Sequence, residues 1–556
     1  MSGESRAAEL WNKSGVQWVA LVALSLFLGV LHLRVDMAKW SVDCIRSGQM
    51  LYLGQFGVAL VHTVVSIGLL LLLAMRSRVV AYVVLPIVLF LWAVPTYLHV
   101  TMGPCMYSEL ITGGLETTWH ELSGFLSWPV AGALLVFGLF CTGLVLVLRR
   151  YFVRLAQLPG RWVWSVALAY IGVTAAIVPL LAEQAPRALL PLLFSPVSGS
   201  EAEKAWQREN QVANMLNETC PAYAYRVLMP YYRQAAFVYY VVDYYREKEV
   251  KKAESLPSRL VCDDDVVVVL VIGESYRADH ASWNGYARET LPQLSALREN
   301  IINFPWFKSF ATSTVSSIYG ILSDATCRNR EAVHTSFLSV MQKHGFNNQL
   351  LLCRTTQWER NPQIAAVLDH KLTNLAICAD TAELESEMRA AVATGGRHVV
   401  LVEDGTGHAP YDHEPRFSKF GMEGMDKFDN CLLQTDDVLY RLITQLQGKK
   451  AVLLYSSDHG QSFGEQGCYM HGGALGVIKQ RHVFSFVWYS DAYAAAHPDK
   501  IATMRENANK PLSHDDIYLS ILSLAGIECE LPTSGCGDFT KQLNRPQTTE
   551  FSLGEE

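Results

Sequence analysis

The run Val266-Val-Val-Val-Leu-Val-Ile-Gly-Glu274 decides how the second half of this chain is expected to fold. Five of its first six residues are valine, and no polar residue interrupts it before the glycine. A β-branched run that ends at a turn residue is typical of a strand buried on both faces of a sheet. Because ligands of open α/β sheets bind at the carboxyl ends of the strands, Glu274 is a candidate metal ligand or base.

A second strand is predicted to end in the same way. The run Ala451-Val-Leu-Leu-Tyr-Ser-Ser457 leads directly into Asp458-His459-Gly460. A carboxylate oxygen and an imidazole nitrogen are ligands that suit zinc. The simpler alternative is that Glu274 and Asp458 only cap the helices after their strands. Two strand ends that each place a glycine near an acid favour a metal site.

The residues around both strand ends resemble the motifs of the bacterial phosphoethanolamine transferases. Gly273-Glu274-Ser275 to Tyr286-Ala-Arg-Glu-Thr-Leu-Pro292 is similar to the signature GET-R-x-x-x…NGY-x-RET-x-P. Ser457-Asp-His-Gly-Gln-Ser-Phe-Gly464 and Tyr469-Met-His-Gly472 are similar to SDHGESLGE…YLHG. The resemblance extends over nearly the whole chain. It implies an N-terminal multi-span α-helical membrane domain and an α/β soluble domain of the sulfatase/alkaline-phosphatase type.

A hydroxyl-rich segment, Phe310-Ala-Thr-Ser-Thr-Val-Ser-Ser-Ile-Tyr-Gly320, precedes a predicted helix. Backbone N–H groups at a helix N-terminus can bind phosphate oxygens, although most Ser/Thr clusters are simply N-caps. The segment resembles the family's C-G-T-x-T-x-x-S-x-P-x-x-x-S block, whose second Thr is the nucleophile and falls on Thr314. Thr312 is the alternative. The family's Cys and Pro are Phe310 and Tyr319 here, so a disulfide from that Cys is missing.

The resemblance implies the roles of the remaining site residues in the soluble domain. The implied zinc ligands are Glu274, Thr314, Asp458 and His459.

Two histidines are implied to face the transferred phosphate, as catalytic and substrate-binding residues. His408 lies in a segment similar to GSHGPxY, and His471 lies in the YLHG-like block. A histidine there can donate to a phosphoryl oxygen or protonate the leaving alkoxide. His280, His413 and His482 are weaker candidates.

Long apolar runs are concentrated in the first 183 residues, and 50% of the whole chain is hydrophobic. Five segments could span a bilayer: Trp18–Leu33, Gly57–Met75, Val79–Val100, Trp128–Leu148 and Trp162–Leu181. Arginines follow the second and fourth segments, whereas the loop Thr101–Ser127 has no Lys or Arg. The loop after the first segment, with Arg34, Lys39 and Arg46, opposes this trend. Because basic loops favour the cytoplasm, we expect a cytoplasmic N-terminus and everything after the fifth span outside.

The acidic loop after the third segment carries a further motif. Gly113-Gly-Leu-Glu-Thr-Thr-Trp-His-Glu121 has the spacing of the family's N-V-x-x-T-x-x-x-E segment. On a helix Thr117 and Glu121 share a face, and the resemblance implies that this face binds the phosphoethanolamine head group. The family's Asn is Gly113 here, and the residues alone would favour a solvated loop.

The chain is too long for one ordinary domain and is expected to have three parts. These are a five-span transmembrane domain (1–183), an interfacial helical linker rich in Tyr and Arg (184–257) and a periplasmic catalytic domain (258–556). The linker helix could instead pack on the soluble domain. Alternating strands and helices predict a parallel sheet covered on both faces, with His398–Glu403 and His482–Ser490 as further buried strands.

The resemblance implies zinc-dependent transfer of phosphoethanolamine from phosphatidylethanolamine through a phospho-threonine, by a multi-pass protein of the bacterial inner membrane. The acceptor stays open among lipid A or lipopolysaccharide, Kdo, core heptose and periplasmic glucan. A membrane phosphoglycerol transferase and a hydrolase of the same superfamily are alternatives. Retention of the implied zinc ligands argues against a non-enzymatic protein, and the net charge of −7 gives no support for a nucleic-acid partner.

The positions of the cysteines predict disulfides. By this topology all of the 12 cysteines except Cys141 lie outside the cytoplasm, where disulfides form. Cys529 and Cys536 are expected to pair across a short Pro- and Gly-containing loop, and Cys44 could pair with Cys105.

Overall fold

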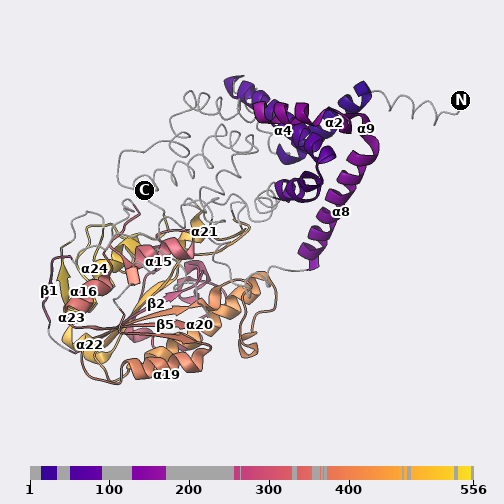
Figure 1. The fold of residues 1–556 in the computed structure, drawn as a ribbon. Coiled ribbons are helices and arrows are strands. Elements are labelled where there is room, and N and C mark those ends of the chain that lie inside the picture. The colour runs from indigo at the N-terminus through magenta and orange to yellow at the C-terminus, as the bar shows by residue number, and fades with distance from the viewer. Residues whose placement is uncertain are drawn as a thin grey trace. The chain divides into compact units, whose positions relative to one another are not determined.

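The computed structural model describes residues 14–33, 50–90, 128–170, 256–262, 265–327, 335–353, 364, 367–368, 372–465, 469–472, 477–530 and 536–552. The chain divides into two compact units (Figure 1). The described residues of the first unit fall within 14–170, and those of the second within 256–552. Thr117, Glu121 and nearly all of the expected linker lie outside the described residues.

The first unit is helical. Its elements are α2 (Ser14–Leu33), α4 (Met50–Arg76), the π-helical turn η1 (Val80–Val84), α8 (Trp128–Tyr151) and α9 (Val153–Ala156). Apolar side chains such as Leu21, Leu71 and Leu144 form a shared buried cluster. Others, such as Leu135 and Val136 of α8, point outward and are each 65% exposed. Helices that are apolar on both their packed and outer faces are typical of membrane spans.

One helix among the described residues, Leu134–Tyr151, is both long and apolar enough to cross a membrane. Shorter apolar helices at Gly15–Leu28, Val64–Arg76 and Val80–Phe90 coincide with parts of the first three expected spans. The fifth expected span begins in a described helix at Trp162 and continues beyond the described residues. The number of spans therefore stays a prediction.

In the first unit, hydrogen bonds join the end of α4 and the start of α2 to the segment that follows α8. Arg76, which ends α4, donates hydrogen bonds to the carbonyl oxygens of Ala156, at 2.6 Å, and Leu158. Gln17, near the start of α2, accepts a hydrogen bond of 3.0 Å from the Arg154 N–H. The start of α2, the end of α4 and the segment after α8 therefore lie on one side of this unit.

A seven-stranded sheet organises the second unit, in the order β3-β12-β8-β2-β7-β5-β6. The strands are β3 (Ile301–Asn303), β12 (Ser485–Tyr489), β8 (Ala451–Ser457), β2 (Val267–Gly273), β7 (His398–Asp404), β5 (Asn347–Cys353) and β6 (Asn374–Cys378). The valine-rich run is the central strand β2, and every residue of it is buried. The predictions of buried strands at β2, β7 and β8 are confirmed.

The sheet is mixed, so the prediction of a parallel sheet was wrong at one edge. β2 pairs in parallel with β7 and β8, and β5 with β7 and β6, but β12 runs antiparallel to β8 and β3. The expected strand His482–Ser490 is also divided. Its first part, β11 (His482–Val483), joins β4 (Phe307–Lys308) and β13 (Leu512–Ser513) in a separate sheet. Burial on both faces cannot indicate strand direction, which explains the error.

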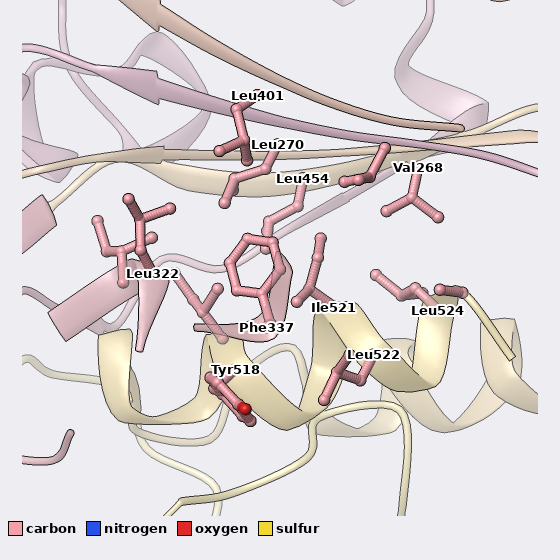
Figure 2. Packing of buried hydrophobic residues seen from close by; sticks show 14 of the residues in the cluster. Val268, Leu270, Leu322, Phe337, Leu401, Leu454, Tyr518, Ile521, Leu522 and Leu524 are labelled. Atoms are coloured by element: carbon pink, nitrogen blue, oxygen red, sulfur yellow. The ribbon is translucent and has the colours of Figure 1, made fainter. Parts of the chain in front are cut away.

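Helices cover both faces of the sheet, as predicted. On one face lie α15 (Thr314–Leu322), α16 (Phe337–Lys343) and α24 (Ile517–Leu524), and on the other α14 (Pro292–Ser295), α19 (Thr381–Ala391) and α20 (Gly424–Leu446). Figure 2 shows Leu270 of β2 above Phe337 and Ile521 of the first group. Burial of each such side chain contributes about 1.5–3 kcal/mol.

Short elements complete the second unit. They are β1 (Ser258–Leu260), β9 (Ser462–Phe463), β10 (Tyr469–Met470), α21 (Ile478–Arg481), α22 (Asp491–Ala496), α23 (Pro498–Asn507) and β14 (Ile527–Cys529). The expected disulfide between Cys529 and Cys536 is not formed, and both thiols are free. Cys529 pairs with Ser258 across β1 and β14, whereas the Cys536 thiol faces the Asp324 carbonyl at 3.8 Å. Cys44 and Cys105 lie outside the described residues.

Candidate active site

The carboxyl ends of β2 and β8 bring the two sequence blocks together. The Asp458 N–H donates to the Gly273 carbonyl at 2.9 Å, and the Tyr276 N–H donates to Ser457 Oγ at 2.6 Å. Residue 273 must be glycine because a Cβ there would lie 2.1 Å from the Tyr455 hydroxyl. The close approach of these strands places Glu274 beside the Asp458-His459 pair.

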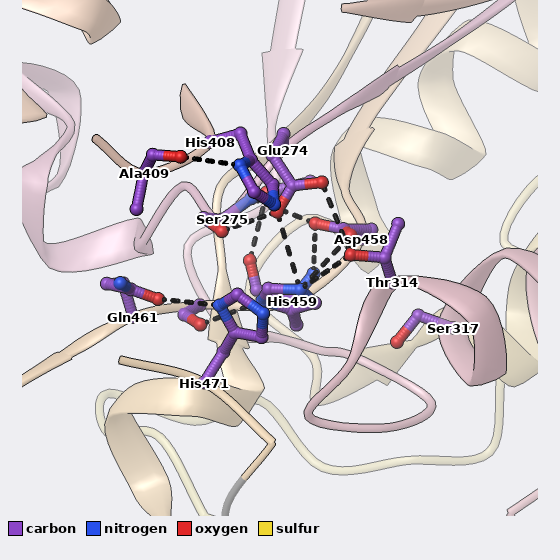
Figure 3. Close-up of polar contacts among 12 residues, drawn as sticks. Glu274, Ser275, Thr314, Ser317, His408, Ala409, Asp458, His459, Gln461 and His471 are labelled. Atoms are coloured by element: carbon purple, nitrogen blue, oxygen red, sulfur yellow. Dashed lines mark hydrogen bonds and ion pairs between the residues drawn. The ribbon is translucent and has the colours of Figure 1, made fainter. Parts of the chain in front are cut away.

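Glu274, Asp458 and His459 form one group of potential metal ligands among the described residues. All three are buried, and their ligand atoms lie within 4.8 Å of one another. His459 Nε2 is 3.5 Å from Glu274 Oε1 and 3.3 Å from Asp458 Oδ2 (Figure 3). Two carboxylates and an imidazole are a ligand set that zinc accepts.

Hydrogen bonds orient these side chains as ligands. His459 Nδ1 donates to the Gly460 carbonyl at 2.9 Å, which leaves the lone pair on Nε2. Asp458 Oδ1 accepts from the Ser275 N–H at 2.9 Å and from the His459 N–H at 2.6 Å. Asp458 Oδ2 is buried and has no hydrogen-bond partner in the described part of the chain. A buried carboxylate oxygen is costly in that state, so the residues present fit a bound cation.

The electrostatics of these three residues also favour a bound cation. Burial, together with the neighbouring Glu274, raises the pKa of Asp458 to about 7. Two adjacent carboxylates repel each other in a buried site, and a cation would remove that repulsion. Ser275 binds both acids, through its N–H to Asp458 and through Oγ to Glu274 at 2.6 Å. It does so with φ 68°, a strained conformation of the kind that clusters at active sites.

Neither acid caps a helix, so the capping alternative was wrong. The 3₁₀ turn after β2, η2 (Ala278–His280), has no side-chain cap. Asp458 instead binds backbone N–H groups at the two strand ends.

Thr314 is the hydroxyl of the Ser/Thr cluster that contacts these ligands. It is the first residue of α15, as the predicted helix start requires. Its Oγ1 lies 3.3 Å from Glu274 Oε2 and 3.2 Å from His459 Nε2 (Figure 3). Thr312, the alternative, uses its carbonyl oxygen to accept a hydrogen bond of 2.6 Å from the Gly472 N–H.

The start of α15 is suited to hold an anion. Its N-cap, Ser313, makes no side-chain capping bond, and the Ser313 hydroxyl is buried without a partner among the residues that the structure describes. The first N–H groups of a helix have no partner within the helix and can bind phosphate oxygens. Phe310, at the position of the family's Cys, packs so closely on α15 that a Cβ at Gly320 would lie 2.3 Å from its ring. This packing fixes the segment where the family would have a disulfide.

His408 reaches the same site from β7. It follows the 3₁₀ turn η5 (Gly405–Gly407), and a Cβ at Gly407 would lie 2.0 Å from the Glu274 carbonyl. His408 Nδ1 donates to the Ala409 carbonyl at 2.7 Å. The turn therefore packs directly on the Glu274 backbone, and His408 appears beside that residue in Figure 3.

His471 completes the cluster. The centre of its ring lies 4.4 Å from that of His459 and 6.2 Å from that of His408. Its Nδ1 donates to Gln461 Oε1 at 3.2 Å, which leaves the lone pair on Nε2. Burial, His459 and His408 lower the pKa of His471 well below its usual value. A neutral His471 with this tautomer accepts a proton more readily than it donates one.

The three weaker histidine candidates make structural contacts. His280 Nδ1 donates to Asp429 at 2.6 Å, and the ring of His280 stacks on that of Tyr286. His413 pairs with Ser418 at 3.0 Å. His482 donates to the Pro305 carbonyl, packs between Trp306 and Phe551, and has its pKa lowered by burial.

The block that resembles NGYxRET has a role that sequence reasoning missed. The Tyr286 hydroxyl and the Arg288 guanidinium both donate to Asp429 Oδ2 at 2.7 Å. Asp429 belongs to α20, is fully buried and also accepts from His280. In the structure the block therefore fixes α20 to the loop after β2. An acid that is buried on a helix cannot be recognised from sequence without knowledge of its partners.

Comparison with known proteins agrees with the motif resemblance. The family model described as Sulfatase matches residues 267–527. Phosphatidylethanolamine transferase Mcr-1 of Escherichia coli is 29% identical over 306 residues, which cover 48% of this chain and 54% of that protein. Kdo(2)-lipid A phosphoethanolamine 7''-transferase of Salmonella typhimurium is 26% identical over 47% of this chain and 52% of its own length. The chain thus spans about half the length of these two curated relatives.

One solved structure matches more of the chain than the second unit alone. The integral membrane protein lipooligosaccharide phosphoethanolamine transferase A of Neisseria meningitidis matches with a TM-score of 0.61 and 19% identity. The match covers 91% of this chain and 95% of that chain. At this identity the match shows a shared fold. The expected α/β domain of the sulfatase type is confirmed, as is the resemblance to phosphoethanolamine transferases.

Proposed function

We propose that this chain, whose residues 267–527 match the sulfatase family model, transfers phosphoethanolamine from phosphatidylethanolamine to a glycan or a lipid A/lipopolysaccharide acceptor of the cell envelope. The observation that carries the proposal is the contact of Thr314 Oγ1 with Glu274 and His459 at the start of α15. The names of the relatives, phosphatidylethanolamine transferase and Kdo(2)-lipid A phosphoethanolamine transferase, supply the transferred group and the acceptor class.

The metal of this proposal is zinc, held by Glu274, Asp458 and His459 with Thr314 at its side. The unpartnered Asp458 Oδ2 and the Nε2 lone pair of His459 support it. Zinc, when bound there, supplies positive charge that stabilises a threonine alkoxide. Side chains and backbone groups of this chain carry out the remaining steps of the reaction.

Thr314 is proposed as the nucleophile. Its oxygen forms a bond to phosphorus, and the bond from phosphorus to the diacylglycerol oxygen breaks. The proton that the Thr314 hydroxyl loses passes to the diacylglycerol oxygen, which leaves as an alcohol, and phosphoethanolamine stays on Thr314 as a phospho-threonine. Free N–H groups at the start of α15 bind the phosphoryl oxygens. An acceptor oxygen then attacks phosphorus and releases the Thr314 hydroxyl.

His408 and His471 are proposed to serve both steps. Each histidine uses Nδ1 for a hydrogen bond within the protein, so Nε2 is the nitrogen that can take part in the reaction. The lowered pKa keeps His471 neutral, so its Nε2 has a lone pair that can accept a proton from the attacking acceptor. Thr117 and Glu121 keep their proposed role in binding the head group on the strength of the family motif alone.

The protein is proposed to be a multi-pass protein of the bacterial inner membrane with its catalytic domain in the periplasm. The shared side of the connections at Gln17, Arg76 and Arg154 supports the orientation, because two of these residues are arginines that favour the cytoplasm. The placement also matches the reaction, since the donor is a membrane lipid and the acceptors are envelope molecules.

Intact-protein mass spectrometry tests the proposal. The full-length protein is incubated with zinc and phosphatidylethanolamine but without an acceptor. We expect a phosphoethanolamine adduct that maps to Thr314 and disappears when an acceptor is added. An adduct obtained only from phosphatidylglycerol would instead identify a phosphoglycerol transferase. Lipid turnover without any adduct from Thr312 to Ser317 would favour hydrolysis or direct transfer.

A further inference from the structure

His514 lies next to the candidate site, and no sequence motif quoted above contains it. It begins the 3₁₀ turn η8 (His514–Asp516) and is fully buried. Its Nδ1 accepts a hydrogen bond of 2.9 Å from the Phe310 N–H. On the opposite side of the ring, Nε2 lies 3.0 Å from the Ser457 carbonyl oxygen.

These two contacts define the state of the imidazole. Because a backbone N–H points at Nδ1, that nitrogen carries a lone pair. The proton is therefore on Nε2 and is donated to the Ser457 carbonyl, with Ser456 Oγ also near at 3.1 Å. Only the neutral ring with this tautomer satisfies both backbone groups at once.

The two backbone groups belong to the two halves of the site. Phe310 opens the segment that leads to Thr314, whereas Ser457 is the residue immediately before Asp458. These segments are more than a hundred residues apart in sequence, and one side chain bridges them. A second bridge, from the Gly472 N–H to the Thr312 carbonyl, ties the His471 segment to the same loop.

His514 is itself firmly placed. Asp516 accepts from the Ser513 N–H at 2.9 Å and binds the Arg545 guanidinium through both oxygens at 2.6 Å. The carboxylate of Asp516 is fully buried. A bidentate arginine pair of this kind has a narrow range of geometry. The turn that carries His514 therefore has little freedom to move relative to the sheet.

We propose that His514 is a positioning residue that sets the separation between the Thr314 hydroxyl and the metal-ligand pair Asp458-His459. It acts through the backbone of Phe310 and Ser457 and touches none of the reacting atoms. The proposal rests on the proposed function only in taking Thr314 as the nucleophile. Catalytic geometry is sensitive to such spacing, since an error of about 1 Å can cost about a hundredfold in rate.

Two substitutions at this position test the proposal in the full-length protein. His514→Phe keeps the ring and removes both hydrogen bonds. In His514→Gln the amide oxygen can accept from the Phe310 N–H while the amide nitrogen donates to the Ser457 carbonyl. We expect the rate of adduct formation at saturating phosphatidylethanolamine to fall about a hundredfold in His514→Phe. The lipid concentration that gives half the maximal rate should stay unchanged. The rate of adduct formation in His514→Gln should be at least tenfold higher than in His514→Phe.

The visible spectrum of the Co²⁺-loaded protein gives a readout that does not depend on activity. We expect His514→Phe to bind Co²⁺ with altered d–d bands and His514→Gln to restore the wild-type bands. If His514→Phe does not fold, His514→Asn, which keeps only the acceptor toward Phe310, replaces it in both comparisons. The same Co²⁺ spectra decide the role of His514 even if the wild type forms no adduct, a result that would overturn only the proposed function.

Asn507→Leu is the matched control. The Asn507 side chain is also buried and bridges two backbone carbonyls, those of Phe539 and Lys541, at 2.9 and 2.8 Å. This control should lower the Tm without changing the rate or the Co²⁺ bands. The proposal is overturned if His514→Phe keeps its rate within threefold, if His514→Gln is as slow as His514→Phe, or if Asn507→Leu slows the reaction equally.

Discussion

Thr314 Oγ1 lies 3.2 Å from His459 Nε2, although 145 positions separate the two residues in the chain. The contact exists because α15 begins beside the carboxyl ends of β2 and β8. The hydroxyl at that helix start therefore meets the buried acids and the imidazole. The proposed nucleophile, the ligands of the proposed metal and a helix start that can bind an anion are thereby combined in one place.

Removal of this hydroxyl should abolish chemistry and leave the fold intact. In Thr314→Ala we expect the loss of the adduct and a rate reduced by several orders of magnitude, because an activated nucleophile is lost. The effect on stability should be about 1 kcal/mol, as for a lost cap. Thr312→Ala is the control and should keep the adduct. An adduct that survives in Thr314→Ala and disappears in Thr312→Ala would move the nucleophile by two residues.

The buried strands and the acids at their ends were accessible from sequence because both follow from local pattern. The run of five valines in positions 266–271 predicts β2, and Glu274 follows at the carboxyl end of that strand. The direction of β12 was not accessible, since a strand buried on both faces has the same composition in either direction. Its antiparallel pairing with β8 depends on the path of the chain between them.

The supporting residues of the site were hidden for a different reason. The chemistry of His514 and Asp429 is defined by their partners, which come from distant segments. A lone histidine or an acid within a helical pattern carries no local signal of such contacts. The free thiols of Cys529 and Cys536 show the same limit, because proximity in sequence did not produce a disulfide.

Metal binding should depend on Asp458. Asp458→Ala removes the one ligand with an unpartnered buried oxygen, so we expect the loss of both bound zinc and adduct formation. Metal content of the purified full-length protein measures the first, and mass spectrometry the second. Asp538→Asn, which alters another buried acid, should keep both. A zinc-free Asp458→Ala protein with full activity would contradict the assignment.

Asp429 should matter for stability. It is fully buried and accepts from His280, Tyr286 and Arg288, so Asp429→Ala leaves the buried His280 ring and the Tyr286 hydroxyl without this acceptor. The partly exposed Arg288 keeps its pair with Asp426 at 2.7 Å. Leaving a buried polar group without its partner costs about 1–3 kcal/mol, and the Tm of the full-length protein should fall accordingly. Glu528→Gln breaks the exposed pair with Arg259 and should change the Tm little. Equal effects of the two substitutions would argue against a stabilising role of Asp429.

Orientation in the membrane can be tested with reporters that work only in the periplasm. We expect activity from a fusion after Leu181 and none from a fusion at Arg150, because the latter belongs to the arginine-rich side that also includes Arg76. A cytoplasmic reporter at the same two positions is the control and should give the reverse pattern. Activity of the periplasmic reporter at Arg150 would invert the proposed topology.

Acid should destabilise the protein partly through His514. Burial lowers the pKa of His514 to about 3 from an ordinary value of 6.5. Between these values the unfolded chain binds a proton that the folded chain does not, so the free energy of unfolding falls as the pH falls. The contribution is complete above pH 6.5, and its loss approaches about 1.4 kcal/mol per pH unit below it. Because glutamine does not titrate, the Tm of His514→Gln should fall less between pH 7 and pH 5 than that of the wild type. Equal losses in the two proteins would show that His514 does not carry this acid sensitivity.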